Sequence, residues 1–148
     1  MGSLTVTIES PQPNAWVKTS PPVPITVTGY AVLDVNGMID DVTVSVGSDT
    51  YTPVENARKL AHWSQTLTPP SGWDLKIKVD AGGSWTTGGS GGTTEHTASD
   101  SKSVTLRADD TAPSVTVVSP VDGAQFSGTT QGFSLHAVGS VTDQESGV

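Results

Sequence analysis

The chain has 148 residues, with 7 basic and 15 acidic side chains and a formal net charge of −8 at pH 7. An acidic chain without a basic run repels the phosphate backbone, so the composition argues against nucleic-acid binding. The absence of cysteine excludes a disulfide framework, a thiolate metal site and a cysteine nucleophile. No apolar run approaches the roughly 18 residues of a membrane span, so we expect no membrane insertion.

Alternating apolar and polar residues predict strands along most of the chain. Valine and threonine, which favour strands, are abundant, and 16 glycines and 10 prolines supply turns. The runs with strand-like alternation are residues 4–9, 25–31, 42–46, 63–67, 73–80 and 104–108. Each run presents one apolar face, and two sheets bury such faces by stacking. We therefore predict an all-β fold, an antiparallel β-sandwich.

The alternation also predicts which side chains form the core. Those expected to be buried are Val27, Val44, Trp63, Leu75, Ile77 and Leu106, with Trp73 also inward. Those expected to be exposed are Lys76, Lys78 and Arg107. A shift of one residue in register would exchange these two sets.

The connections are predicted from proline, glycine and polar segments. Prolines in residues 10–14 and 20–22 divide the first strand into two edge segments, because proline cannot donate to a ladder. Residues 54–62 are expected to form a short helical turn that crosses between the sheets. Residues 81–95 are mostly Gly, Thr and Ser, which predicts a long flexible loop. We expect this domain to span residues 1–110.

An internal repeat connects the two ends of the chain. Residues 5–17 reappear as residues 114–126, with five identical positions, at Val, Thr, Ser, Pro and Ala. A predicted strand with Phe133, Leu135 and Ala137 matches residues 25–31. Residues 111–148 are therefore expected to be the N-terminal strands of a second, incomplete copy. We expect its strands to lie on opposite sheets, with the apolar faces at Val115, Val117, Phe126, Phe133 and Leu135 either docked or exposed.

Five segments carry a resemblance to a known family: residues 62–67, 75–81, 110–117, 119–124 and 143–148. In these segments the chain resembles the bacterial immunoglobulin-like (Ig-like) domains that occur in tandem in secreted and surface proteins. The resemblance implies an Ig-like β-sandwich, neighbouring repeats in the same chain and an extracellular or cell-surface location. The first four residues lack the charged and apolar regions of a signal peptide.

Two matches to catalytic patterns are rejected on their context. Gly88–Gly92 fits G-x-S-x-G, but a nucleophile elbow needs a strand-to-helix turn and this match lies in a glycine run. Ser99–Lys102 fits S-x-x-K, but no helix is predicted there to bring the lysine beside the serine. We therefore predict that the chain is not an enzyme.

Several acidic residues are expected at loop ends or near the domain junction. Converging carboxylates could hold calcium, which takes six to eight oxygen ligands. The candidate ligands are Asp34, Asp80, Asp109 and Asp110. Solvated turn carboxylates are the alternative and the one we favour, so no cofactor is expected. The three histidines, His62, His96 and His136, are scattered and expected on the surface.

The four tryptophans have different expected environments. Trp63 and Trp73 are predicted in the core, and Trp16 is predicted to be half-buried at the proline-rich edge. Trp85 stands in the glycine-rich segment without apolar neighbours in sequence. It either stacks on a sugar ring or a partner surface, or folds back to cap the edge of the sandwich.

Three functions are compatible with these features. The first is a non-catalytic structural or spacer module of a surface or secreted protein, in adhesion or stalk formation, with a stiff linker at residues 109–113. The second is a carbohydrate- or protein-recognition module that uses Trp85. The third is an accessory domain of a secreted hydrolase or a phage-like particle.

Overall fold

The computed structural model describes residues 1–128, 132 and 134–143, and all regular structure within them is β-strand. The prediction of an all-β chain is confirmed. The described part contains no helix with the length and apolarity needed to cross a membrane. The chain divides into two compact units, Met1–Ala108 and Asp109–Val148. We call them the first unit and the second unit and describe each separately.

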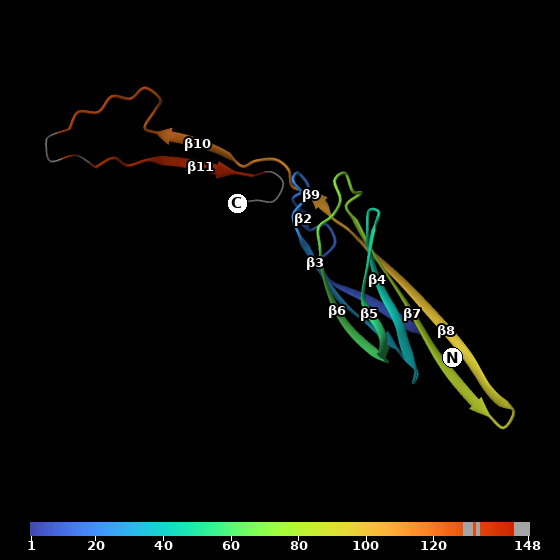
Figure 1. Ribbon diagram of the computed structural model, residues 1–148. Helices are drawn as coiled ribbons and strands as arrows, with labels where there is room; N and C mark the ends of the chain where they lie inside the picture. Colours follow the sequence, from blue (N-terminus) through green and yellow to red (C-terminus); the bar gives the residue numbers. More distant parts are fainter. Residues whose placement is uncertain (129–131, 133, 144–148) are drawn as a thin grey trace. The chain divides into compact units, whose positions relative to one another are not determined.

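The first unit consists of two main antiparallel sheets and one short parallel pair (Figure 1). One sheet has the order β1-β3-β6, with β1 (Leu4–Ser10), β3 (Ile25–Leu33) and β6 (Leu60–Leu67). The other has the order β5-β4-β7-β8, with β4 (Met38–Val46), β5 (Asp49–Arg58), β7 (Lys76–Gly89) and β8 (Gly92–Thr105). The short pair joins β2 (Trp16–Val17) to β9 (Arg107–Ala108). The division of the first strand by prolines is thereby confirmed.

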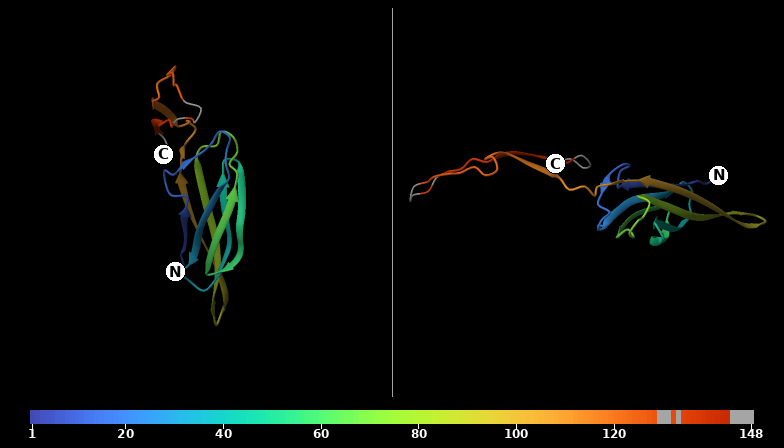
Figure 2. Two further views of the ribbon diagram at one scale, coloured as in Figure 1. Left: turned by 90° about the vertical axis from the view of Figure 1, so that its left-hand side faces the viewer. Right: turned by 90° about the horizontal axis from the view of Figure 1, so that it is seen from above.

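The two main sheets share one apolar core, an arrangement compatible with a β-sandwich (Figure 2). The predicted inward residues Val27, Val44 and Ile77 are fully buried, and Trp63, Trp73 and Leu106 are also buried. The predicted outward residues Lys76, Lys78 and Arg107 are exposed. Every buried side chain in the described residues is apolar. The register predicted from alternation is therefore confirmed at these positions.

Leu75 departs from the prediction because the strand begins later than its alternation indicates. It is half-buried and has a φ of 59°, in the left-handed region that interrupts a strand. Its carbonyl accepts a 2.8 Å hydrogen bond from the backbone N–H of Leu106, and β7 starts only at Lys76. The turn that leads into the strand therefore places Leu75 at the margin of the core.

The helical turn predicted for residues 54–62 is wrong, because strands β5 and β6 occupy this segment. Between them lies Lys59 alone, with a φ of 47°. Its carbonyl accepts a 2.8 Å hydrogen bond from the N–H of Leu33. The chain does cross between the two sheets here, but a single left-handed residue makes the turn instead of a helix.

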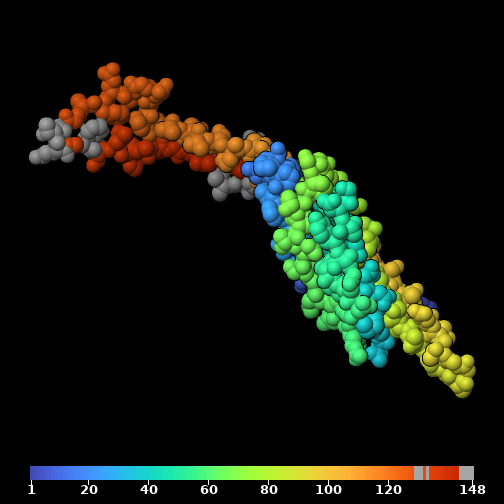
Figure 3. All heavy atoms as spheres, viewed as in Figure 1, coloured from blue at the N-terminus to red at the C-terminus, as the bar shows by residue number. Residues whose placement is uncertain are grey.

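The flexible loop predicted for residues 81–95 is also wrong. Strands β7 and β8 continue through it as a hairpin, paired without interruption from Lys76↔Thr105 to Gly89↔Gly92. Its two-residue turn, Ser90 and Gly91, is followed by Gly92 with a φ of 125°, which only glycine adopts readily. Strand β4 accompanies β7 only to Ser84, so the hairpin extends beyond the sheets (Figure 3). We call residues 86–95 the hairpin arm.

The second unit contains one antiparallel hairpin in its described residues. Strand β10 (Ser114–Ser119) pairs with β11 (Val138–Thr142), so the expectation that its strands lie on opposite sheets is wrong. The strand predicted around residues 133–137 is displaced toward the C-terminus, and Phe133 and residues 144–148 lie outside the described residues. Of the predicted apolar positions, Val115, Val117, Phe126 and Leu135 are exposed.

The contrast between Ile77 and Leu75 gives a stability test. Ile77→Ala should lower the free energy of unfolding by about 2–5 kcal/mol, because it leaves a cavity in a fully buried site. Leu75→Ala should cost clearly less, since Leu75 is half-buried. Urea unfolding of the first unit measures both losses, with Lys76→Ala as an exposed control on the same strand. Equal losses at residues 75 and 77 would contradict the observed start of β7.

Candidate functional site

Trp85 is the last inward side chain of β7. The inward positions of this strand are Ile77, Val79, Ala81, Gly83 and Trp85, at the two-residue period of a strand. Trp85 is half-buried and packs against the core. The alternative in which Trp85 is an exposed residue of a flexible loop is therefore wrong, and the alternative in which the indole folds back to cap the core is confirmed.

A histidine from the neighbouring strand stacks on this indole. Trp85 and His96 are direct cross-strand partners, with ring centroids 5.4 Å apart and an angle of 15° between the ring planes. The Nε2 atom of His96 lies 2.8 Å from the hydroxyl oxygen of Thr87, which fixes the orientation of the imidazole. His96 is half-buried, in contrast to the surface position expected for it. The two rings stack on each other at the base of the arm.

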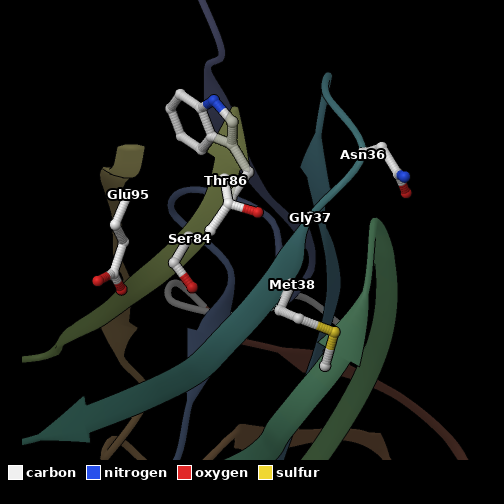
Figure 4. Close-up of a pocket in the computed structure, with 7 residues that line it drawn as sticks. Asn36, Gly37, Met38, Ser84, Thr86 and Glu95 are labelled. Carbon is white, nitrogen blue, oxygen red and sulfur yellow. The ribbon is translucent and has the colours of Figure 1, made fainter. Parts of the chain in front are cut away.

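Two hollows lie beside this stack. The larger, of about 580 Å³, is lined by Met1, Gly2, Val35, Asn36, Trp85, Thr86, Thr87 and His96. We call it the arm-base groove. The smaller, of about 200 Å³, is lined by Asn36, Gly37, Met38, Ser84, Trp85, Thr86 and Glu95 (Figure 4). Asn36, Trp85 and Thr86 line both hollows.

The lining groups favour hydrogen bonding and stacking. Hydroxyls, one amide and one carboxylate surround the aromatic surface, and neither hollow is lined by a lysine or an arginine. In the described part of the chain, His96 has no carboxylate partner that would complete a catalytic triad with Thr87. The hydroxyls and the amide can donate and accept hydrogen bonds, and the indole offers an apolar ring.

The two rejected catalytic patterns lie in strand and turn. Gly88–Gly92 forms the tip of the hairpin arm, where β7 turns into β8 without a helix. Ser99 and Lys102 are three residues apart on β8, so their side chains start from opposite faces of the strand. The S-x-x-K chemistry needs the serine and the lysine on the same face, whereas here the backbone of β8 lies between their side chains.

The N-terminal residues cover one edge of the indole. A Cβ atom on Gly2 would lie 2.7 Å from both Trp85 and Val35, so the chain approaches the ring closely there. Ser3 next to it donates two hydrogen bonds to the Asp34 carboxylate, 2.6 Å from its backbone N–H and 2.9 Å from its hydroxyl. These bonds hold the pKa of Asp34 below its ordinary value. Asp34 thus fixes the N-terminus beside the groove.

The structure does not bring the four candidate calcium ligands together. Asp34 binds Ser3, while Asp80 lies on β7 with its carboxylate 2.9 Å from the Lys78 ammonium. Burial raises the pKa of Asp80, but hydrogen bonds from Lys78 and Ser101 outweigh it, and the pKa is lowered. Asp109 and Asp110 belong to the second unit. No group of three or more potential metal ligands occurs among the described residues.

The remaining aromatic and imidazole side chains lie outside this site. Trp16 is 39% exposed, somewhat more than the half-burial predicted, and the Arg107 guanidinium lies 5.6 Å from its ring centroid. His62 is exposed, with its ring centroid 5.7 Å from that of Tyr30. His136 is exposed, in agreement with its predicted position in the second unit.

Comparison with protein-family models, with curated proteins and with solved structures gives no match to this chain. Sequence reasoning missed the stack because it ended the strand near Ala81. The continuing two-residue period through Gly83 to Trp85 was the signal that could have placed the indole inward. His96 was not predictable as its partner, because only the cross-strand register joins them.

The Ser3–Asp34 interaction predicts a specific pH dependence of stability. Because the folded pKa of Asp34 is lowered, the unfolded chain binds more protons than the folded chain between the folded pKa and the ordinary value of 3.8. The stabilisation is therefore present above that pH and is lost as the pH falls through the folded pKa. Asp34→Asn should flatten the loss of unfolding free energy in this acidic range, measured by urea titration at several pH values. Ser3→Ala, which keeps the backbone donor, should have an intermediate effect; an unchanged slope in Asp34→Asn would contradict this role.

Proposed function

We propose that the chain is a non-catalytic, load-bearing module of a modular surface or secreted protein, with an Ig-like first unit. The observation that carries the proposal is the parallel pairing of β2 with β9, which joins the start of the first unit to its end. By contrast, the strands within the two main sheets all pair in antiparallel fashion. The position and direction of this pair favour a mechanical role.

Two backbone hydrogen bonds reinforce the parallel pair at its N-terminal end. The N–H of Asn14 donates to the carbonyl of Thr105 at 2.8 Å, and the N–H of Arg107 donates to the carbonyl of Ala15 at 2.9 Å. The Arg107 guanidinium also lies 5.6 Å from the centroid of the Trp16 ring, in cation–π range. We call these contacts and the β2–β9 pair the strand clamp.

The direction of the strands determines how the clamp responds to tension. A force that pulls the two ends of the first unit apart draws β2 toward its N-terminus and β9 toward its C-terminus. In a parallel pair these movements slide the strands along each other, so the bonds between them are loaded together. The bonds of an antiparallel pair opened from one end would break one after another. Tension applied at residue 1 reaches the clamp through β1, so the clamp would resist extension together with the pairing of β1 and β3.

Two further features support a structural role. The core of the first unit buries only apolar side chains in the described residues, and its titratable groups are left on the surface. A second β unit begins at Asp109, directly after β9, so the clamp lies where tension would pass from one unit to the next. Asp109–Pro113, with its proline, has restricted backbone freedom.

Single-molecule extension tests the load-bearing role. Arg107→Pro removes the N–H that donates to Ala15, a bond worth about 0.5–1.5 kcal/mol. The unfolding rate of the first unit under constant force, applied through residues 1 and 109, should rise several-fold. Thr26→Ala is the matched control, since it removes the 2.9 Å bond to Thr66 between β3 and β6. Equal acceleration by both variants would show that the clamp has no special mechanical role.

A second candidate function is recognition of a neutral carbohydrate or of a protein surface at the arm-base groove. The specific observation is the Trp85–His96 stack, 5.4 Å between centroids, with hydroxyl and amide groups around it. Aromatic faces bind the apolar faces of sugar rings, and neighbouring hydroxyls and amides bind their hydroxyl groups.

Titration with neutral oligosaccharides, followed by tryptophan fluorescence, tests this candidate. If it is correct, Trp85→Ala should weaken binding by about tenfold or more, equivalent to about 1.4 kcal/mol. Asn36→Ala, at an exposed position, should weaken binding without unfolding the protein. Trp16→Ala removes an exposed indole elsewhere and should leave binding unchanged. Absence of saturable binding to the unaltered protein would eliminate the carbohydrate candidate.

A further inference from the structure

The hairpin of the second unit has the same register as the first hairpin of the first unit. Each pair of β10 and β11 corresponds to one pair of β1 and β3, at a constant offset of 109 residues on one strand and 110 on the other. Five pairs in the first hairpin have a counterpart in the second. They are Thr5↔Val32 with Ser114↔Thr142, Val6↔Ala31 with Val115↔Val141, Thr7↔Tyr30 with Thr116↔Ser140, Ile8↔Gly29 with Val117↔Gly139, and Ser10↔Thr28 with Ser119↔Val138.

An irregularity and a glycine also coincide in the two hairpins. The register shifts between Ile8 and Ser10 in one hairpin and between Val117 and Ser119 in the other. Next to the shift, a Cβ atom on Gly29 would collide with the carbonyl oxygen of Thr7. A Cβ atom on Gly139 would likewise collide with the carbonyl oxygen of Thr116, the residue that corresponds to Thr7. A bulge and a close approach at the same place do not follow from hairpin geometry in general.

This correspondence corrects the alignment expected from sequence. The sequence pattern matched Phe133, Leu135 and Ala137 to the strand at residues 25–31, whereas the register places Gly139 at the position of Gly29 and Val141 at that of Ala31. The offset is 109 residues from β1 to β10 and 110 residues from β3 to β11. The connection between β10 and β11 is therefore one residue longer than the connection between β1 and β3.

The corresponding residues differ sharply in exposure. Val6 and Ala31 are 1% and 0% exposed, because the sheet β5-β4-β7-β8 covers them. Their counterparts Val115 and Val141 are 69% and 47% exposed. The second unit therefore presents, uncovered, the apolar face that the first unit buries.

We propose that the face of the β10–β11 hairpin bearing Val115 and Val141 binds a twisted antiparallel sheet of the β5-β4-β7-β8 type. The partner's inner face would carry alternating β-branched residues, as Val42, Val44, Ile77 and Val79 do in the first unit. The sheet of the first unit is not free for this, since β1, β3 and β6 already cover it. Within the part of the chain that the structure describes, β11 pairs with β10 alone. Its other edge corresponds to the edge at which β3 pairs with β6, so the partner also supplies a strand there.

A graft tests the proposal by supplying such a sheet. Residues 33–108 are fused directly after residue 142, because Thr142 corresponds to Val32 and the next residue in the first unit is Leu33. The β10–β11 amides should then exchange about a hundredfold more slowly than in the 148-residue chain. A second cooperative unfolding transition should appear beside that of the first unit.

Two substitutions in the graft identify the face involved. Val115→Asp should abolish the second transition and the added protection, because its counterpart Val6 is buried. Ser114→Asp should leave both unchanged, because its counterpart Thr5 is exposed. A second version of the graft carries Val141→Ala, so that position 141 has the alanine found at the corresponding position 31. This removes the possibility that the larger valine prevents packing.

Three results would overturn the proposal. One is unchanged exchange of the β10–β11 amides in both versions of the graft, and another is an equal effect of Val115→Asp and Ser114→Asp. The third is a dimer of the unmodified 148-residue chain, detected by light scattering, in which Val115→Asp restores the monomer. That result would assign the face to a second copy of this chain. The extension experiment on the strand clamp is independent, since it uses only the first unit.

Discussion

The first unit depends on one constraint, the burial of apolar side chains between two sheets. There is no cysteine to cross-link the chain. The described residues bury no polar or charged side chain, so no internal ion pair contributes. The largest of the almost completely buried side chains are all aliphatic and branched at Cβ or Cγ: Leu33, Ile39, Ile77, Val6, Val27, Val42, Val44, Val46 and Val79. These rigid residues pack well on pleated surfaces.

The ends of this core are closed in two different ways. At one end, β2 and β9 pair in parallel and bring the second and last strands of the unit together. At the other, Trp85 covers the core where β4 no longer accompanies β7, and His96 stacks on its ring. A residue that closes a core and also lines a groove serves packing first. Its proposed role in recognition therefore depends on the part of the indole that the N-terminal residues and His96 leave uncovered.

The second unit shows what the same hairpin pattern looks like without a covering sheet. Strands β10 and β11 pair because backbone hydrogen bonds and the close approach at Gly139 need only the two strands. Their valines remain exposed because nothing in the described residues packs on them. A hairpin alone buries too little apolar surface to be independently stable in water. The proposed partner sheet would supply what the hairpin lacks and would make the second unit resemble the first.

The sequence by itself determined that the chain is all-β, which side chains point inward and outward, and most of the core. Val27, Val44 and Ile77 follow from the two-residue period, because that period is a local property of the backbone. Tertiary structure alone decided where strands begin and which residues meet across them. Lys59 turns the chain with one left-handed residue, and the polar, glycine-rich segment after Ala81 is a strand because β8 pairs with it. The Trp85–His96 stack and the parallel β2–β9 pair join residues distant in sequence, so no local pattern encodes them.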